Sequence, residues 1–300
     1  MARKGHSYRE YGFFLSPEDT YPNQLEQILR ASGCRVSVVN GGAEGYKSWE
    51  NLASLLFRAP EIEPDIVIIH EGFNDVGARL VLPGRYLPDN RGNAGPFRDY
   101  PPEEWWRKSN FLRICAVASG RAIGSNSLQY QQRQPLFLPL LLTKQLREGR
   151  YPSGVFAKYP VDELLRCNAP THYRRNLKMQ AAACQQNDWE LVFATMAFGV
   201  PGSDPLIAEC RIEGVRENNA VMRNVAQEAQ VSLCDLEKVM PQDASLYVDG
   251  LHTTTDGAVA KAQAIANFLL DNMIVSPTSE PVATSPATQN IPVSRKTAIE

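Results

Sequence analysis

The stretch DIVIIHEGFND, residues 65–75, decides the fold. Its first six residues are β-branched and almost continuously apolar, which is typical of a strand that is covered on both faces of a parallel sheet. The same pattern occurs in RVSVVN (35–40), ELVFAT (190–195) and VSLCDL (231–236). The sequence therefore predicts at least four strands of one parallel sheet.

Helical patterns lie between and after these strands. Apolar residues recur at helical spacing within residues 22–32, 171–187, 213–230 and 256–273. Strands that alternate with helices indicate right-handed crossovers, which place helices on both faces of the sheet. We therefore predict an α/β protein, a three-layer α/β/α sandwich around a parallel sheet.

Two segments do not follow this alternation. Residues 76–168 are rich in Pro, Gly, Arg and aromatic residues and are helical in pattern at 103–119 and 136–149. We interpret them as one large insertion over the carboxyl end of the sheet, either a lid or a small subdomain. Residues 275–300 carry few large apolar groups and are expected to form a disordered tail, which leaves one domain over residues 1–274.

Composition excludes several classes of protein. The net charge of -2 argues against a nucleic-acid partner, which needs a basic face. No apolar run approaches the roughly 18 residues of a membrane span, and the N-terminus MARKGHSYRE shows no signal peptide. The six cysteines are scattered without ligand spacing, so we predict buried reduced thiols rather than disulfides or a metal site: Cys34, Cys115, Cys167, Cys184, Cys210 and Cys234.

Four polar segments follow predicted strands or open the chain: GHS (5–7), NGGAEG (40–45), GFND (72–75) and DGLH (249–252). Ligands of open α/β sheets bind at the carboxyl ends of strands. In DGLH, Asp249 can accept a hydrogen bond from one ring nitrogen of His252 and hold the other nitrogen toward a nucleophile. The alternative is a surface histidine beside a helix-capping aspartate.

The other two internal segments suit an oxyanion. Asn74 in GFND can aim its amide at developing negative charge, although it can equally form a turn that caps a helix. The glycines of NGGAEG leave backbone N–H groups bare. VSVVNGGAEG also offers a dinucleotide-binding alternative with Glu71 at the ribose, but the full G-x-G-x-x-G is absent, and neither GFND nor DGLH is then explained.

Together and in this order, the four segments resemble those of the SGNH hydrolases, the GDSL esterase and lipase superfamily. The stretch SPEDTYPNQLEQIL (16–29) is similar to the one that follows the nucleophile in many bacterial members. The resemblance implies a flavodoxin-like fold with no metal and no organic cofactor. It also implies Ser7 as nucleophile, His252 as general base and Asp249 as its partner, with an oxyanion hole formed by Ser7, Gly45 and Asn74.

The activity that the resemblance implies is that of a serine esterase acting on small-molecule carboxylic esters, with short-chain acyl or acetyl groups, through an acyl-enzyme. Two alternatives within the family are a lipase or lysophospholipase-like enzyme and a carbohydrate deacetylase. An alternative of another class is a catalytically silent binding module.

The first block departs from the family pattern. His6 stands at the usual aspartate, Gly12 comes one position late, and only residues 1–4 precede Gly5, where the family has a central apolar strand. We therefore expect a truncated first strand. A nucleophile held without that strand would be placed less rigidly, and weak activity is the corresponding hypothesis.

Overall fold

The computed structural model describes residues 15–89, 109–119 and 137–278. Within these ranges one parallel sheet has the strand order β1-β2-β3, formed by β1 (Ile66–His70), β2 (Glu190–Ala194) and β3 (Ser232–Cys234). Ile66 pairs with Glu190, and Val192 pairs with Ser232. Three of the predicted strands are thus confirmed, and the α/β class with a parallel sheet is confirmed with them.

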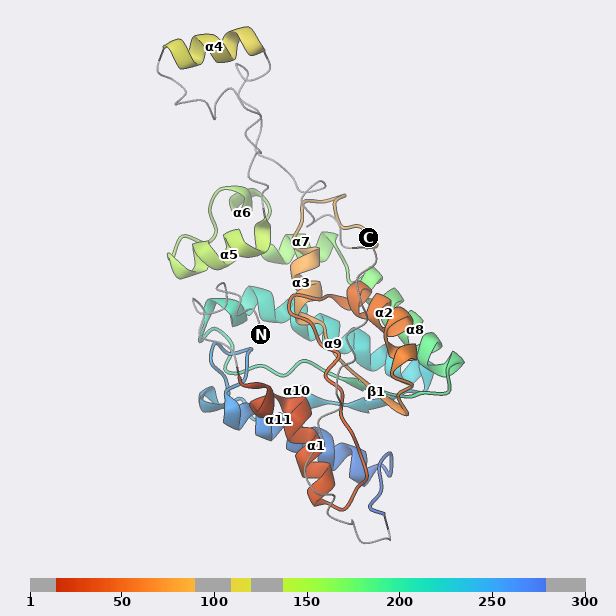
Figure 1. The fold of residues 1–300 in the computed structure, drawn as a ribbon. Coiled ribbons are helices and arrows are strands. Elements are labelled where there is room, and N and C mark those ends of the chain that lie inside the picture. The colour runs from red at the N-terminus through yellow and green to blue at the C-terminus, as the bar shows by residue number, and fades with distance from the viewer. Residues whose placement is uncertain (1–14, 90–108, 120–136, 279–300) are drawn as a thin grey trace, which may run out of the picture.

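Helices make up most of the described chain (Figure 1). The long helices that the apolar spacing predicts are all present, with ends shifted by a few residues. The α-helices are α1 (Tyr21–Ala31), α2 (Ser48–Phe57), α3 (Phe73–Arg79), α4 (Asn110–Ala118), α5 (Leu138–Arg147), α6 (Val155–Lys158), α7 (Val161–Cys167), α8 (Thr171–Gln186), α9 (Glu209–Ala229), α10 (Leu236–Val239) and α11 (Thr255–Asp271). Short 3-10 turns are η2 (Pro17–Asp19), η3 (Ala59–Glu61), η8 (Pro205–Ile207) and η9 (Ala244–Leu246).

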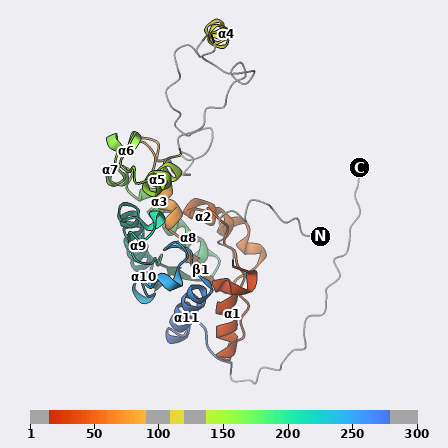
Figure 2. The same ribbon diagram turned by 90° about the vertical axis from the view of Figure 1, so that its left-hand side faces the viewer.

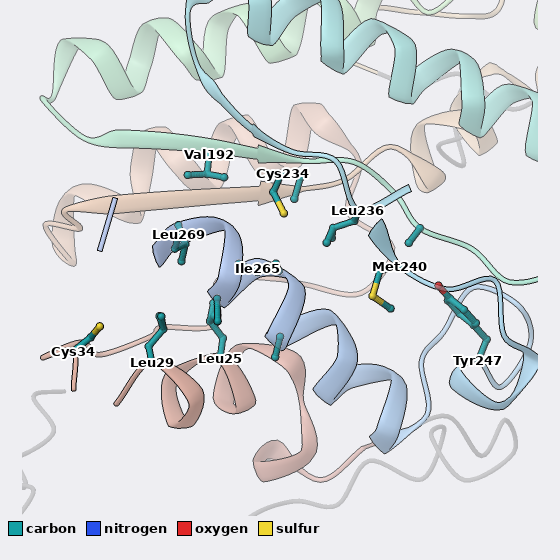
Figure 3. Packing of buried hydrophobic residues seen from close by; sticks show 14 residues of the cluster. Leu25, Leu29, Cys34, Val192, Cys234, Leu236, Met240, Tyr247, Ile265 and Leu269 are labelled. Atoms are coloured by element: carbon teal, nitrogen blue, oxygen red, sulfur yellow. The ribbon is translucent and has the colours of Figure 1, made fainter. Parts of the chain in front are cut away.

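One face of the sheet is covered by α1 and α11, which lie side by side in both views (Figures 1 and 2). Leu25 and Leu29 of α1 and Ile265 of α11 pack with Val192 of β2, and all four are buried (Figure 3). Full burial of one such side chain contributes about 1.5–3 kcal/mol, so this cluster is a principal source of stability.

The opposite face is covered by α2, α8 and α9. Leu177 of α8 and Met222 of α9 share a buried cluster with Ile69 and Phe193 of the strands. Side chains alternate along a strand, so odd and even residues of β2 point to opposite faces, and both faces are apolar. This double coverage explains why the strands read as continuous apolar runs rather than as alternating ones.

A third apolar cluster joins α3, α5, α6 and α7 to the rest of the domain. It contains Val76, Leu142, Phe156 and Leu251, the last from the DGLH segment. The described part of residues 76–168 therefore packs against a segment that the sequence singles out as functional. Residues 90–108 and 120–136 of that expected insertion lie outside the described residues.

The predicted strand at 35–40 is wrong. Its backbone bonds to side chains of α1 instead of to a strand: the Val38 N–H donates to Glu26 Oε2 at 2.6 Å, and Arg30 Nε donates to the Val36 carbonyl at 2.9 Å. Val36 and Val38 pack against the α1 and α11 cluster, which accounts for the alternating apolar residues. Within the described residues no strand pairs with this segment, and a strand requires such a neighbour.

The end of the described chain returns to α1. The backbone N–H and the hydroxyl of Thr278 both donate to the Gly33 carbonyl, at 3.0 and 3.2 Å. The rest of the expected disordered tail, residues 279–300, lies outside the described residues. None of the helices described here combines the length and the apolar character that crossing a membrane would need.

The six cysteines are free, and Cys34, Cys184 and Cys234 are buried as predicted. The prediction of burial is wrong for Cys115 and Cys167, which are exposed. Each lies in a helix, and a helical position in the sequence does not by itself show whether a cysteine is buried.

Candidate active site

The DGLH segment brings an aspartate and a histidine into contact. Asp249 Oδ2 lies 2.7 Å from His252 Nδ1, and Asp249 Oδ1 accepts the backbone N–H groups of Leu251 and His252 at 3.0 and 2.8 Å. The Asp249 side chain is 6% exposed, whereas that of His252 is 55% exposed. Burial acts to raise the pKa of Asp249, but the hydrogen bonds from His252 and Leu251 outweigh it and lower that pKa overall.

The shape of this loop depends on a glycine. Gly250 has a φ of 79°, and a Cβ at that position would lie 2.1 Å from Ile207 Cδ1. Its carbonyl accepts the Gly199 N–H at 2.7 Å, which fastens the loop to the segment that follows β2. The Val248 N–H donates to the His252 carbonyl at 2.7 Å, so the loop closes on itself immediately before α11.

The GFND segment forms the start of α3, directly after β1. Asn74 Nδ2 donates to the Tyr46 carbonyl at 2.9 Å. Tyr46 follows Gly45, whose φ of 74° turns the chain before α2. A side-chain hydrogen bond therefore joins the GFND segment to the residue that directly follows NGGAEG.

Two neighbouring asparagines of α9 connect the GFND side of the site to the DGLH side. Asn218 Nδ2 donates to the Gly72 carbonyl at 2.8 Å. Asn219 bonds both the N–H and the carbonyl of Met196, each at 2.9 Å, and thereby fixes the segment that carries Gly199. Because Gly199 in turn bonds Gly250, both candidate segments are anchored through one helix.

Two buried carboxylates lie at the GFND segment, with Glu71 directly before it and Asp75 as its last residue. Burial and the nearby negative charge of Asp75 raise the pKa of Glu71 to about 8, although Asn51 and Gln180 donate to it. Burial likewise raises the pKa of Asp75 to about 6, against the lowering effect of its hydrogen bonds from Ser48. The sequence indicated Glu71 only as a ribose ligand in the dinucleotide alternative, and the contacts with Asn51 and Gln180 occupy its carboxylate instead.

A buried lysine is a feature that the sequence analysis missed. Lys261 Nζ lies 3.3 Å from His70 Nε2, and 5.3 Å from the centre of the Tyr21 ring. Burial lowers the pKa of Lys261 to about 8, and burial together with the Lys261 charge lowers the pKa of His70 to about 3. The signal was present, because Lys261 occupies an apolar position of α11 at helical spacing from Ala258 and Ile265.

The remaining predicted site residue, Ser7, lies outside the described residues, as do His6 and Gly12. The structure thus brings Asp249 to His252, and Asn74 to the loop of Gly45. In the part of the chain that is described, no group of three His, Cys, Asp or Glu side chains is arranged to hold a metal ion.

Comparison with known proteins gives one family and several solved structures. A model described as the GDSL-like Lipase/Acylhydrolase family matches residues 5–260. No curated protein sequence matches the chain.

The solved structures are similar at low sequence identity. A lipase/acylhydrolase from Enterococcus faecalis is 17% identical, with 87% of this chain and 88% of that chain covered and a TM-score of 0.48. LAE5, an alpha/beta hydrolase enzyme from the metagenome of Lake Arreo, Spain, is 16% identical over 83% and 81%, with a TM-score of 0.47. A catalytic mutant of Axe2, an acetylxylan esterase from Geobacillus stearothermophilus, is 15% identical over 83% and 80%, with a TM-score of 0.45.

Proposed function

Because the chain belongs to the GDSL-like lipase/acylhydrolase family, we propose that it is a serine esterase that cleaves small carboxylic esters with short acyl or acetyl groups. The observation that carries this proposal is the 2.7 Å contact between Asp249 Oδ2 and His252 Nδ1. A carboxylate in that position fixes the ring and stabilises the positive charge that a general base acquires.

In this proposal Ser7 is the nucleophile. Its Oγ attacks the ester carbonyl while His252 takes the hydroxyl proton, and a bond forms between Oγ and the acyl carbon. The bond from that carbon to the alcohol oxygen then breaks, and His252 gives its proton to the departing alcohol. Water attacks the acyl-enzyme in the second half, with His252 again accepting and returning the proton, and the free acid leaves.

The negative charge on the carbonyl oxygen requires donors that are already in place. We assign this task to the backbone N–H groups of Ser7 and Gly45 and to the Asn74 amide. An amide nitrogen has two N–H groups, and the bond from Asn74 to Tyr46 uses one of them. Loss of one such donor typically reduces kcat by about 10²–10³.

Hydrolysis of p-nitrophenyl acetate, butyrate and octanoate by the full chain tests the activity and its preference for acyl length. Ser7→Ala and His252→Ala are expected to lower kcat at least about 10³-fold, because the nucleophile and the base act as a unit. Ser32→Ala and His172→Ala are the matched controls. The Ser32 hydroxyl donates to the Ile28 carbonyl at the end of α1, and His172 packs beside the Tyr86 ring, so both variants should retain activity.

Labelling with a fluorophosphonate gives a second readout that does not depend on the choice of ester. The adduct is expected on Ser7 and is expected to be absent from the Ser7→Ala variant. No hydrolysis of the three esters and no labelling would contradict the proposal and would favour the catalytically silent binding module. Turnover of an acetylated sugar but not of the p-nitrophenyl series would favour the carbohydrate deacetylase instead.

A further inference from the structure

A buried hydrogen-bond network holds the first turn of α2 against the start of α3. Ser48, the first residue of α2, donates its hydroxyl to Asp75 Oδ1 at 2.5 Å and its backbone N–H to Asp75 Oδ2 at 3.0 Å. The Ser48 side chain is completely buried, and Asp75 is 2% exposed. A buried carboxylate held by two donors from one residue fixes both the distance and the orientation of the two segments.

A further buried amide completes the surroundings of Ser48. Asn176 Nδ2 of α8 donates to the Ser48 hydroxyl at 2.8 Å, so this oxygen both donates and accepts. Gln180 Nε2 donates to the Ser48 carbonyl at 3.2 Å and to Glu71 Oε1 at 3.2 Å. The turn that begins α2 is thus bonded to α3 and to α8 in the interior, and Gln180 of α8 links it to Glu71, the residue after β1.

The same two segments carry the proposed oxyanion donors. Asn74 precedes Asp75 in α3, and Gly45 precedes Ser48 by three residues. Asn74 bonds the Tyr46 carbonyl while Asp75 bonds Ser48, so two neighbouring residues of α3 hold the turn at two points. A single hydrogen bond would let the turn rotate about that bond, whereas two hydrogen bonds at different points fix the orientation of the turn.

We propose that Asp75 and Ser48 are positioning residues of the oxyanion hole, because their buried contact sets the place of the Gly45 N–H relative to the Asn74 amide. This inference rests on the proposed esterase function. Both residues are buried, and in this proposal they act through the donors rather than on the substrate. Their contribution comes from the geometry of the donors, for which a misplacement of about 1 Å can reduce the rate on the order of 10²-fold.

Ser48→Ala and Asp75→Asn test the inference in the full chain with p-nitrophenyl butyrate. Each is expected to lower kcat about 10- to 100-fold and to leave KM within about twofold, because the oxyanion forms only in the transition state. Inhibition by an alkylboronic acid, whose tetrahedral adduct with Ser7 resembles that state, should weaken in proportion to kcat. If the two residues had a purely structural role, kcat and the affinity for the boronic acid would not fall in proportion while KM stays constant.

Gln145→Ala is the control for a general loss of stability. Gln145 is buried and bonds both the N–H and the carbonyl of Ser153, and these bonds involve neither α2 nor α3. All variants are compared at a temperature at which circular dichroism shows them folded. If Asp75→Asn does not fold, Ser48→Ala, which removes one hydroxyl only, decides the outcome.

The two possible failures are distinguishable. Wild-type chain without hydrolysis or labelling would overturn the proposed function and this inference with it. An active wild type whose Ser48→Ala and Asp75→Asn variants keep kcat within about twofold, or lose no more than Gln145→Ala does, would overturn the inference alone. A fall in kcat with a parallel loss of boronate affinity supports it.

Discussion

Asp249 holds His252 at two points: its Oδ1 atom accepts the histidine backbone N–H at 2.8 Å, and its Oδ2 atom lies 2.7 Å from the ring Nδ1. One carboxylate therefore fixes both the main chain and the side chain of the same residue. The ring direction of a half-exposed histidine is then set by the fold rather than by solvent. The three-residue spacing makes this possible, because the loop needs no distant partner for the contact.

Asp249→Asn should lower kcat by about 10³–10⁴, because an asparagine amide can stabilise neither the reactive tautomer nor the imidazolium. The measurement is steady-state hydrolysis of p-nitrophenyl butyrate. Asp243→Asn is the control, since Asp243 also accepts from a backbone N–H and a side chain, those of Ser245, in the turn η9. Equal kcat in the two variants would contradict the role of Asp249.

Gly250→Ala should lower the free energy of unfolding by at least about 2 kcal/mol, since a side chain at positive φ costs about 1–3 kcal/mol and overpacking against Ile207 costs about 1–3 more. Gly202→Ala separates the two causes, because Gly202 has the same φ of 79° but no atom within 4 Å of its Cβ position. Urea unfolding measures both variants. If Gly250→Ala and Gly202→Ala lose the same free energy of unfolding, the contact with Ile207 adds nothing to the cost at Gly250.

Glu71→Gln should reduce the dependence of stability on pH. The pKa of Glu71 is raised from its ordinary 4.5 to about 8, so the folded chain retains a proton that the unfolded chain releases. The contribution of Glu71 to stability is therefore complete below about pH 4.5 and is lost as the pH rises through about 8. Glutamine does not titrate and can still accept from Asn51.

The free energy of unfolding should consequently fall less between pH 5 and pH 8 in Glu71→Gln than in the wild type, and the variant should be relatively more stable at pH 8. Urea titrations at intervals across this range give the two slopes. Glu190→Gln is the control, because Glu190 is exposed at the start of β2. Parallel curves for Glu71→Gln and the wild type would show that Glu71 is charged in the folded chain.

Asn219→Ala should lower the free energy of unfolding by about 2 kcal/mol, because it leaves the N–H and the carbonyl of Met196 without their partner. It should also lower kcat, since the Met196 segment supports Gly250 through Gly199. Asn187→Ala is the control, as the Asn187 side chain donates to the Ala183 carbonyl at the end of its own helix. If folded Asn219→Ala keeps the kcat of the wild type, the geometry of the site does not depend on the contacts that α9 makes with the Met196 segment.

The parts of the molecule that the sequence predicts are those that local pattern determines. β1, β2 and β3 follow from buried apolar runs, and the Asp249 and His252 contact follows from a spacing of three residues. The segment 35–40 has an equally apolar pattern but is bonded to Glu26 and Arg30. The alternating apolar residues of this segment pack against α1 and α11. A single sequence does not reveal whether a partner strand is present.

Contacts between distant segments are not predictable from local sequence pattern. Ser48 and Asp75 are 27 residues apart, and no local pattern in the sequence connects them. Asn218 and Asn219 read as polar residues of a long helix, yet both are buried because their amides bond backbone groups of two loops. Such residues become recognisable only when the fold supplies the groups that they bond.

The pairing of α1 with α11 has a consequence for synthesis of the chain. Residues 32–254 separate these two helices, so the apolar face of α1 leaves the ribosome long before its partner exists. Until α11 emerges, Leu25 and Leu29 stay available to chaperones and to other nascent chains. This side of the molecule is therefore completed late, in the order set by translation, and truncation within α11 should yield insoluble product.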